Sequence, residues 1–245
     1  MELKAENLSI GYRSDKIIFS DISFSACEGE MIALLGINGI GKSTLLRTIS
    51  GLQKSAGGNI LVGEKKLESL PVGERAKLIS IVLTEKIFVD NISVKEFIAL
   101  GRSPYTNWMG KLSDEDLKEL DKVIVVMKLD KLQHKFFNQI SDGEKQKVLI
   151  ARALCQQTPV IILDEPTAFL DFRNKKEILE LLSSVSHELK KIVILSTHDI
   201  DASLAYCSKC WLMTEERKFI EIKRSEKFRS EVMNLLFAET SNSHS

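Results

Sequence analysis

The stretch "GINGIGKST", residues 36 to 44, decides the fold, because it carries three glycines, one lysine and two hydroxyl side chains in nine positions. Glycine loses more conformational entropy on folding than other residues, so a loop this rich in it indicates that something approaches its backbone closely. A buried-strand pattern, "MIALLG", precedes the loop and a helical pattern, "KSTLLRTIS", follows it. In that context the spacing G-x-x-x-x-G-K-[ST] predicts a phosphate-binding loop.

The residue types of this loop suit a nucleotide polyphosphate bound with magnesium. We expect its glycines to let backbone N–H groups converge on the β-phosphate, while the following helix presents its positive end. Lys42 would reach the β and γ oxygens, Ser43 would ligate Mg²⁺, and Thr44 would add a phosphate contact. The expected nucleotide contacts here are Gly36, Asn38, Gly39, Gly41, Lys42, Ser43 and Thr44. The alternative is a glycine-rich turn with a chance lysine.

A second candidate element is "VIILDEP", residues 160 to 166, an apolar run that ends in two adjacent acids. Asp164 would hold Mg²⁺, usually through water, and Glu165 could polarise the water that attacks a γ-phosphate. An apolar run followed by Asp-Glu is common by itself. This element indicates a metal and water site only because a phosphate loop lies upstream of it in the sequence.

The stretch "ISDGEKQKVLIARAL" begins a predicted helix and supports two interpretations. Ser141 with Glu144 three residues later forms the pattern of a capping box, which needs no ligand. A capped helix start with Gly143 beside it is also an anion site. We keep both interpretations.

The pattern along the chain predicts an α/β protein with a helical insertion. Residues 2–9, 17–25 and 30–36 are expected to be extended, and the segment 85–159 is expected to be mostly helical, with helices at 93–101, 113–128 and 141–156. In the second of these helices an apolar stripe is expected to be core: Leu117, Leu120, Ile124 and Met127. The strands "PVIILD" and "KIVILST", separated by the helix "NKKEILELLSSVSHEL", are typical of a parallel sheet.

The composition and the cysteine pattern argue against several classes of protein. The chain has 245 residues with 34 Lys plus Arg and 34 Asp plus Glu, so no overall basic field points to nucleic acid. The charged start "MELKAENLSI" is neither a secretory signal nor a membrane anchor, so we expect a cytoplasmic protein in which a partner supplies any membrane. Cys207 and Cys210 form a C-x-x-C, which we interpret as two small buried side chains rather than a zinc or redox site.

The ordered motifs resemble those of the ATPase subunit of an ATP-binding-cassette (ABC) transporter over nearly the whole chain. "GINGIGKST" resembles the family's phosphate loop, "ISDGE" its L-S-G-G-Q signature, "VIILDEP" its second acidic motif, "AFLD" its D-loop and "STHD" its switch-histidine loop. The resemblance implies a P-loop NTPase (RecA-like) core with an N-terminal antiparallel β subdomain and an inserted α-helical subdomain. The implied layout is a single ABC ATPase domain over residues 1–245, with the nucleotide-binding core at 1–84 and 159–237, the helical subdomain at 85–158 and a polar tail at 238–245.

The resemblance also implies activity and residue roles. It implies hydrolysis of ATP to ADP and phosphate, with ATP and Mg²⁺ as cofactors and Glu165, His198 and Lys42 as catalytic residues. Tyr12 would stack on adenine, unless it is an ordinary aromatic at a strand end, and such stacking would also admit GTP. Two copies would close head to tail over two MgATP, so that Ser141 and Gly143 of one copy face the nucleotide of the other. Asp171 would cross the interface.

The chain departs from the family pattern at two places. The family's glutamine between the first two motifs is missing, because no glutamine occurs between Gln53 and Gln133; either Thr84 or Glu85 would take its role near magnesium. In the signature, Ile140, Asp142 and Glu144 replace Leu, Gly and Gln. The added charge of Asp142 near an anion calls for compensation by Lys145 or Lys147.

Two further stretches, "ALGRSPYTNWMGKLSDED" and "STHDIDASLAYCSKCWLM", resemble ATPases that serve importers of iron-siderophore complexes, haem or cobalamin. The chain would then be peripheral on the inner face of the cell membrane, with permease helices docked near residues 84–92 and a substrate-binding protein acting indirectly. An exporter or a transporter of another solute remains an alternative. A soluble ABC ATPase acting on DNA or ribosomes, and a nucleotide-binding regulator that hydrolyses little, are alternatives from other classes.

Overall fold

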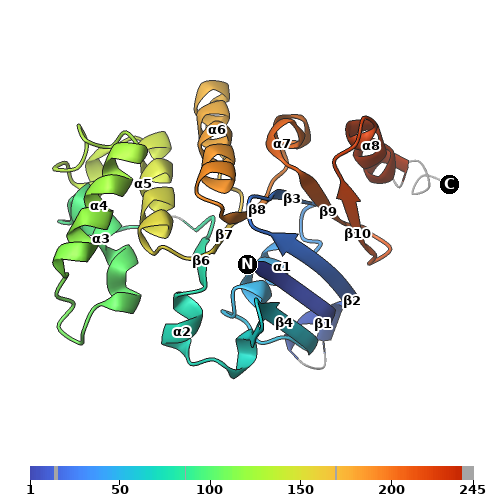
Figure 1. The fold of residues 1–245 in the computed structure, drawn as a ribbon. Coiled ribbons are helices and arrows are strands. Elements are labelled where there is room, and N and C mark those ends of the chain that lie inside the picture. The colour runs from blue at the N-terminus through green and yellow to red at the C-terminus, as the bar shows by residue number, and fades with distance from the viewer. Residues whose placement is uncertain (14–15, 86, 169, 239–245) are drawn as a thin grey trace.

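The computed structural model describes residues 1–13, 16–85, 87–168 and 170–238, which form two sheets and a group of helices (Figure 1). The first sheet is antiparallel, in the order β2-β1-β4-β5. Its strands are β1 (Glu2–Arg13), β2 (Lys16–Cys27), β4 (Gly57–Val62) and β5 (Lys65–Lys66). Most of the expected polar tail lies outside the described residues.

The second sheet has the order β10-β9-β3-β8-β7-β6, and all its strands except β10 run parallel. Its strands are β3 (Met31–Leu35), β6 (Ile79–Val82), β7 (Val160–Leu163), β8 (Ile192–Ser196), β9 (Lys209–Met213) and β10 (Phe219–Lys223). Every residue of β3, β7 and β8 is buried. These strands read as unbroken apolar runs because both faces of a parallel sheet are covered.

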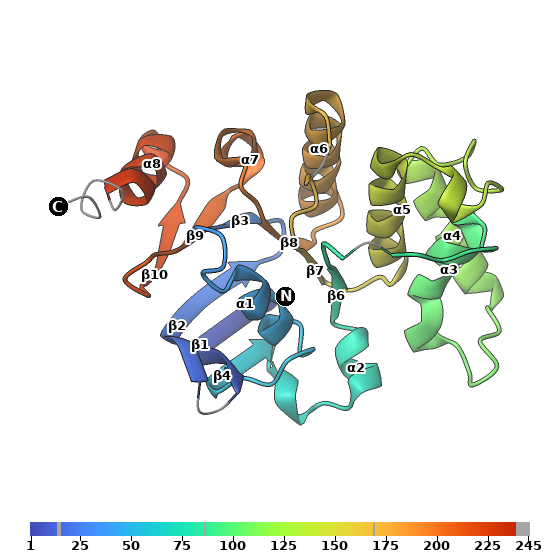
Figure 2. The same cartoon turned by 180° about the vertical axis from the view of Figure 1, so that it is seen from behind.

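The helices cover both faces of this sheet and form a separate group at one end of the molecule. They are α1 (Lys42–Ile49), α2 (Val72–Ala76), α3 (Val94–Ala99), α4 (Asp114–Val126), α5 (Asp142–Cys155), α6 (Phe172–Glu188), α7 (Ile200–Tyr206) and α8 (Phe228–Ala238), with short 3₁₀ turns η1 (Leu67–Ser69), η2 (Leu100–Tyr105) and η3 (Phe137–Gln139). In both views α3, α4 and α5 lie at the end opposite β10 and α8 (Figures 1 and 2). None of the helices in the described ranges combines the length and the apolar character needed to span a bilayer.

Alternation along the buried strands divides the interior into two cores. Ile32 and Leu34 of β3 pack with α1 and the antiparallel sheet, whereas Met31, Ala33 and Leu35 pack with the helices of the other face. Successive side chains of a strand point to opposite faces, so five residues of β3 serve both cores. The expected α/β fold, with an antiparallel β unit and inserted helices, is confirmed.

The expected helical stripe is correct except at its first position. Leu120, Ile124 and Met127 are buried, but Leu117 is 42% exposed. The buried face of α4 runs through Asp116 instead, because the Asp116 carboxylate accepts a 2.7 Å hydrogen bond from Nε of the buried Arg102. The expected helix at 93–101 is also shorter than predicted, since α3 gives way to η2 at Leu100 and Pro104 follows.

The buried Arg102–Asp116 pair holds the helical group together and generates a stability prediction. Arg102 also donates to the carbonyl of Cys155 at 2.9 Å and to Oε1 of Gln157 at 2.7 Å, so it joins η2, α4 and the end of α5. Arg102→Ala leaves a buried carboxylate without its counter-charge, and we expect it to lower the free energy of unfolding by about 3 to 5 kcal/mol. Guanidinium chloride unfolding followed by circular dichroism measures this.

The control for that measurement is Lys176→Ala, because Lys176 forms an exposed ion pair with Glu180 on α6 at 3.7 Å. Exposed pairs are screened by water and contribute little. Equal stability losses in the two variants would contradict the assignment of the buried pair as a structural anchor.

Candidate functional site

The phosphate loop connects β3 to α1 and has a backbone that requires glycine at its first position. Gly36 has φ +150°, and a Cβ there would lie 2.7 Å from the carbonyl oxygen of Met213 on β9. Gly41 has φ +120° and stands at the N-cap of α1. The loop therefore bends tightly over the end of β3 and leads its backbone into the first turn of the helix, where N–H groups remain for an anion.

Lys42 is the first residue of α1 and points back into the loop. Its side chain is buried, and Nζ donates to the carbonyl oxygens of Gly36 at 2.8 Å and Ile37 at 3.0 Å. Desolvation lowers the pKa of Lys42, and the nearby carboxylates of Glu165 and Asp164 oppose that shift. An ammonium has three N–H groups, so this one is held at the centre of the loop with donor capacity left for an anion.

The two acids of the second motif follow directly on β7. Asp164 is buried, its N–H donates to the carbonyl of Val82 at 2.8 Å, and its own carbonyl accepts from Oγ1 of Thr84 at 2.8 Å. Glu165 has φ +51°, a left-handed conformation that costs a non-glycine residue about 1 to 3 kcal/mol and concentrates at functional sites. Its side chain is 29% exposed, so the carboxylate is open to a ligand.

His198, which the family resemblance implies to be catalytic, lies beside Glu165. His198 Nε2 and Glu165 Oε1 are 2.5 Å apart, and the His198 side chain is 41% exposed. The turn after β8 is shaped locally, because the N–H of Asp199 donates to Oγ1 of Thr197 at 3.0 Å. The histidine therefore faces the carboxylate that is expected to polarise water.

The residues present fit a nucleotide-bound Mg²⁺. No group of three or more His, Cys, Asp or Glu side chains suited to a metal occurs in the ranges that the structure describes. Mg²⁺ typically takes one or two protein oxygens and completes its shell with water and phosphate, so the exposed hydroxyl of Ser43 and the carboxylate of Asp164 suffice. Both oxygen types are hard ligands of the kind this ion prefers.

Thr84 and Glu85, the two candidates for the role of the missing glutamine, make different contacts in the structure. Thr84 bonds the backbone of Asp164 at 2.8 Å and so belongs to the acidic motif. Glu85 forms an ion pair at 2.5 Å with Arg47 on α1, and its side chain is largely exposed. Thr84 is therefore the better placed of the two near the predicted metal ligands.

The signature segment forms the capping box expected at the start of α5. Glu144 Oε2 accepts from the N–H of Ser141 at 2.8 Å and from its Oγ at 2.7 Å, while Ser141 Oγ accepts from the N–H of Glu144. Hydrogen bonds from Ser141 lower the pKa of Glu144. Of the two lysines expected to compensate Asp142, Lys145 lies 3.5 Å away, and Lys147 pairs with Glu177 instead.

Asp171 caps α6 and connects this helix to the signature segment. Its carboxylate accepts from the N–H of Asn174 at 2.9 Å and from Nδ2 of Asn174 at 2.8 Å, which lowers the pKa of Asp171. A Cβ on Gly143 would lie 3.2 Å from the same Asn174 amide. Asp171, Asn174 and Gly143 therefore form one surface unit.

The predicted site residues form two groups in the single chain. The phosphate loop, Thr84, Asp164, Glu165 and His198 gather at the carboxyl ends of β3, β6, β7 and β8. Ser141, Gly143 and Asp171 belong to α5 and α6, and α5 is separated from α1 in both views (Figures 1 and 2). Tyr12 belongs to β1, but its side chain lies outside the described part.

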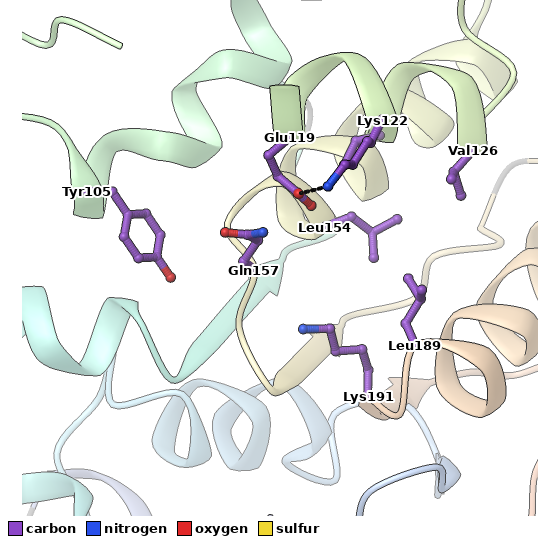
Figure 3. A pocket seen from close by; sticks show the side chains of 9 residues that line it. Tyr105, Glu119, Lys122, Val126, Leu154, Gln157, Leu189 and Lys191 are labelled. Atoms are coloured by element: carbon purple, nitrogen blue, oxygen red, sulfur yellow. Dashed lines mark ion pairs between the residues drawn. The ribbon is translucent and has the colours of Figure 1, made fainter. Parts of the chain in front are cut away.

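Hollows in the described part of the chain also lie away from the phosphate loop, and two of them border the helical group. One of about 520 Å³ lies between α4, the end of α5 and the turn before β8, with Tyr105, Val126, Gln157, Leu189 and Lys191 in its wall (Figure 3). Gln157 precedes β7 and Lys191 precedes β8, so this hollow lies near the amino ends of these strands, whereas the acidic motif follows the carboxyl end of β7. The other, of about 250 Å³, is lined by Leu52, Val82, Glu85, Ile87 and Arg152, close to the segment expected to dock a permease.

Cys207 and Cys210 have no exposed surface, as the sequence interpretation expected. Burial raises the pKa of Cys207 to about 12 and raises that of Cys210 further, so both remain protonated thiols. Thiolates are the reactive and metal-binding form of cysteine. The pair is therefore part of the core.

Comparison with known proteins places the chain among ABC transporters. The family model described as "ABC transporter" matches residues 19–168. An uncharacterized ABC transporter ATP-binding protein, MJ0873, from Methanocaldococcus jannaschii is 35% identical over 96% of this chain and 81% of its own length. The iron(3+)-hydroxamate import ATP-binding protein FhuC of Bacillus subtilis is 32% identical over 81% of this chain and 74% of its own length.

Solved structures of ABC transporter cassettes have the same fold as this chain. CbiO1 from Clostridium perfringens, part of the ABC transporter complex cbiONQ, matches with a TM-score of 0.80 and 30% identity over 98% of this chain and 97% of that one. The dimeric ABC transporter cassette MJ0796 matches with a TM-score of 0.76 and 25% identity over 91% of this chain and 99% of that one.

Gly36 provides a direct test of the loop geometry. In Gly36→Ala the new Cβ would meet the Met213 carbonyl at 2.7 Å in a backbone conformation that alanine avoids. Strain of about 1 to 3 kcal/mol corresponds to roughly 5- to 150-fold in affinity, and we expect ATP binding to weaken by that factor. Isothermal titration calorimetry with ATP and Mg²⁺ measures it.

Gly73→Ala is the matched control, because a Cβ at Gly73 on α2 meets nothing within 4 Å. This variant should bind ATP as the parent chain does. Unchanged affinity in Gly36→Ala would show that the loop does not contact the nucleotide as described.

Proposed function

The chain belongs to the ABC transporter family, and on that premise we propose that it is the ATP-hydrolysing motor subunit of an importer, working as a pair of identical copies. The observation that carries the proposal is the cluster of Lys42, Asp164, Glu165 and His198 at one edge of the parallel sheet. This cluster combines a cation for phosphate oxygens, a metal-binding carboxylate and an open carboxylate beside a histidine.

Each residue has a distinct role in the proposed reaction. Lys42 turns its ammonium from the loop carbonyls to the β and γ oxygens of ATP. Glu165 polarises the attacking water and takes its proton, and His198 orients that carboxylate and contacts the γ-phosphate. Ser43 and Asp164 would hold Mg²⁺, which neutralises negative charge on the phosphates when it is bound.

A second copy supplies the contacts that one chain lacks. The separation of α5 from α1 supports an arrangement in which Ser141 and Gly143 face the nucleotide of the partner and Asp171 crosses the interface. The related cassette MJ0796 is a dimer. A ligand drives closure only through contacts that it makes better in the closed state, and here these are bonds to the γ-phosphate. ADP lacks that group, so hydrolysis reopens the pair.

The surface beside the hollow of about 250 Å³ supports the proposed docking of permease helices. Phe88 is 89% exposed next to this hollow, which fits a surface that permease helices cover at residues 84–92. The chain would then sit peripherally on the inner face of the cell membrane, with a substrate-binding protein acting indirectly. We also propose the layout of a core at 1–84 and 159–237, a helical subdomain at 85–158 and a tail at 238–245, and stacking of Tyr12 on the adenine.

The proposed cargo is an iron-siderophore complex, haem or cobalamin. Import of iron(3+)-hydroxamate is the named function of the relative FhuC, which supports this class. The alternatives are transport of another solute, export, a soluble ABC ATPase and a regulator with little hydrolysis. The retained Glu165–His198 pair favours hydrolysis over the regulator, and a phosphate-release assay on the purified chain decides between them.

Glu165→Gln tests the hydrolytic role. Glutamine keeps the shape of the side chain but cannot accept the proton of water, so we expect ATP binding to persist while turnover falls by about 10² to 10⁴. The unhydrolysed nucleotide should trap dimers, which size-exclusion chromatography with light scattering detects. A population that stays monomeric with ATP would count against the paired arrangement.

Uptake tests address the cargo. The chain is co-purified with its membrane subunits, reconstituted in vesicles, and supplied with ferric hydroxamate siderophore, haem or cobalamin. We expect ATP-dependent import of one of the three, and no import with Glu165→Gln. Transport of none of them would overturn the proposed cargo, and movement of one of them out of the lumen would overturn the proposed import direction. Either result leaves the ATPase assignment intact.

A further inference from the structure

Ser196, the last residue of β8 and the first of the "STHD" segment, contacts both acidic residues, a role that the sequence did not predict for it. Its side chain has no exposed surface. Oγ donates to Oδ1 of Asp164 at 2.6 Å and accepts from the N–H of Glu165 at 2.9 Å. One hydroxyl therefore directs its proton to a carboxylate and a lone pair to the next peptide group.

We propose that Ser196 is a positioning residue for ATP hydrolysis, which orients the Asp164 carboxylate and fixes the left-handed backbone of Glu165. This inference rests on the proposed function. Backbone conformations such as that of Glu165 persist only where the surroundings hold them, and the Ser196 hydroxyl bonds the N–H of this residue directly. With Oδ1 of Asp164 engaged by Ser196, the other carboxylate oxygen is the one left for a ligand.

Strand register explains why these groups meet. β7 and β8 are neighbouring parallel strands in which Leu163 pairs with Leu195. The residues that come next are Asp164, which directly follows β7, and Ser196, which ends β8, so the two lie side by side at the sheet edge. Thr84, after β6 on the other side, bonds the Asp164 carbonyl. The Asp164–Glu165 peptide is thus held from both neighbouring strands.

Two residues at the end of β8 and just after it contact Glu165. Ser196 holds its backbone, and His198, two residues later, contacts its carboxylate. A hydroxyl is suited to the first task because it both donates and accepts, whereas alanine does neither. Loss of the hydroxyl leaves the phosphate loop unchanged and frees the acids to turn, so it should affect the chemical step more than ATP binding.

The test compares kcat with ATP affinity. Ser196→Ala should lower kcat on the order of 10- to 100-fold, the effect expected of a misplaced catalytic group. ATP affinity, measured by calorimetry in EDTA so that hydrolysis does not occur, should change by less than about threefold. Ser196→Thr restores a hydroxyl and should recover most of the lost kcat.

Ser186→Ala is the matched control, because Ser186 on α6 is equally buried and its Oγ has no hydrogen-bond partner among the described residues. It should keep the parental kcat. Thermal melting is recorded for each variant. If Ser196→Ala does not fold, Ser196→Cys, which keeps the side-chain size with a weaker donor, takes its place and faces the same outcomes.

Two results would overturn the inference. One is a kcat for Ser196→Ala close to that of the parent chain, and the other is a loss that appears equally in ATP affinity or is not recovered by a stably folded Ser196→Thr. Glu165→Gln in the same assay separates this failure from that of the proposed function. If Glu165→Gln is inactive while Ser196→Ala is fully active, only the role of Ser196 is wrong. If Glu165→Gln is fully active, the proposed function fails.

Discussion

The burial of β3, β7 and β8 on both faces is the constraint on which the rest of the structure depends. Strands without an exposed face cannot place a polar group along their length, so polar side chains gather where the strands end. Since these neighbouring strands run parallel, their carboxyl ends meet at one edge. The phosphate loop, the acidic pair and the histidine segment each follow one of these strands.

Charge at that edge is arranged around Lys42. Its ammonium is partly desolvated, and its nearest named charges are the carboxylates of Asp164 and Glu165. A polyphosphate entering the loop brings negative charge toward a lysine and a helix N-terminus, while the acids require a cation or a proton donor between them and the phosphate. Mg²⁺ and water satisfy that need in the proposed reaction, and Ser196 and Thr84 hold the acids in place for it.

The sequence predicted those parts of the site that depend on neighbours along the chain. The phosphate loop, the Asp164–Glu165 pair and the Ser141 capping box each lie within a few consecutive residues, so their spacing was informative. The sequence left Thr84 and Glu85 as alternatives and assigned no role to Ser196, because the contacts of Thr84 and Ser196 with the acids depend on the register between separate strands. Leu117 was expected to be buried, but the tertiary pairing of Asp116 with Arg102 turned the helix so that this leucine is exposed.

The central claim is that two copies complete each nucleotide site, and cross-linking between chains tests it most directly. Exposed Cys27 is first replaced by serine, while the buried cysteines remain unreactive. In Glu165→Gln chains, one population carries Ile37→Cys at an exposed position of the phosphate loop and the other carries Asp142→Cys at the start of α5. With ATP and a short bismaleimide, the account predicts cross-links between the two populations that disappear with ADP. A chain carrying both cysteines that cross-links only within itself, or mixed chains that never cross-link, would contradict it.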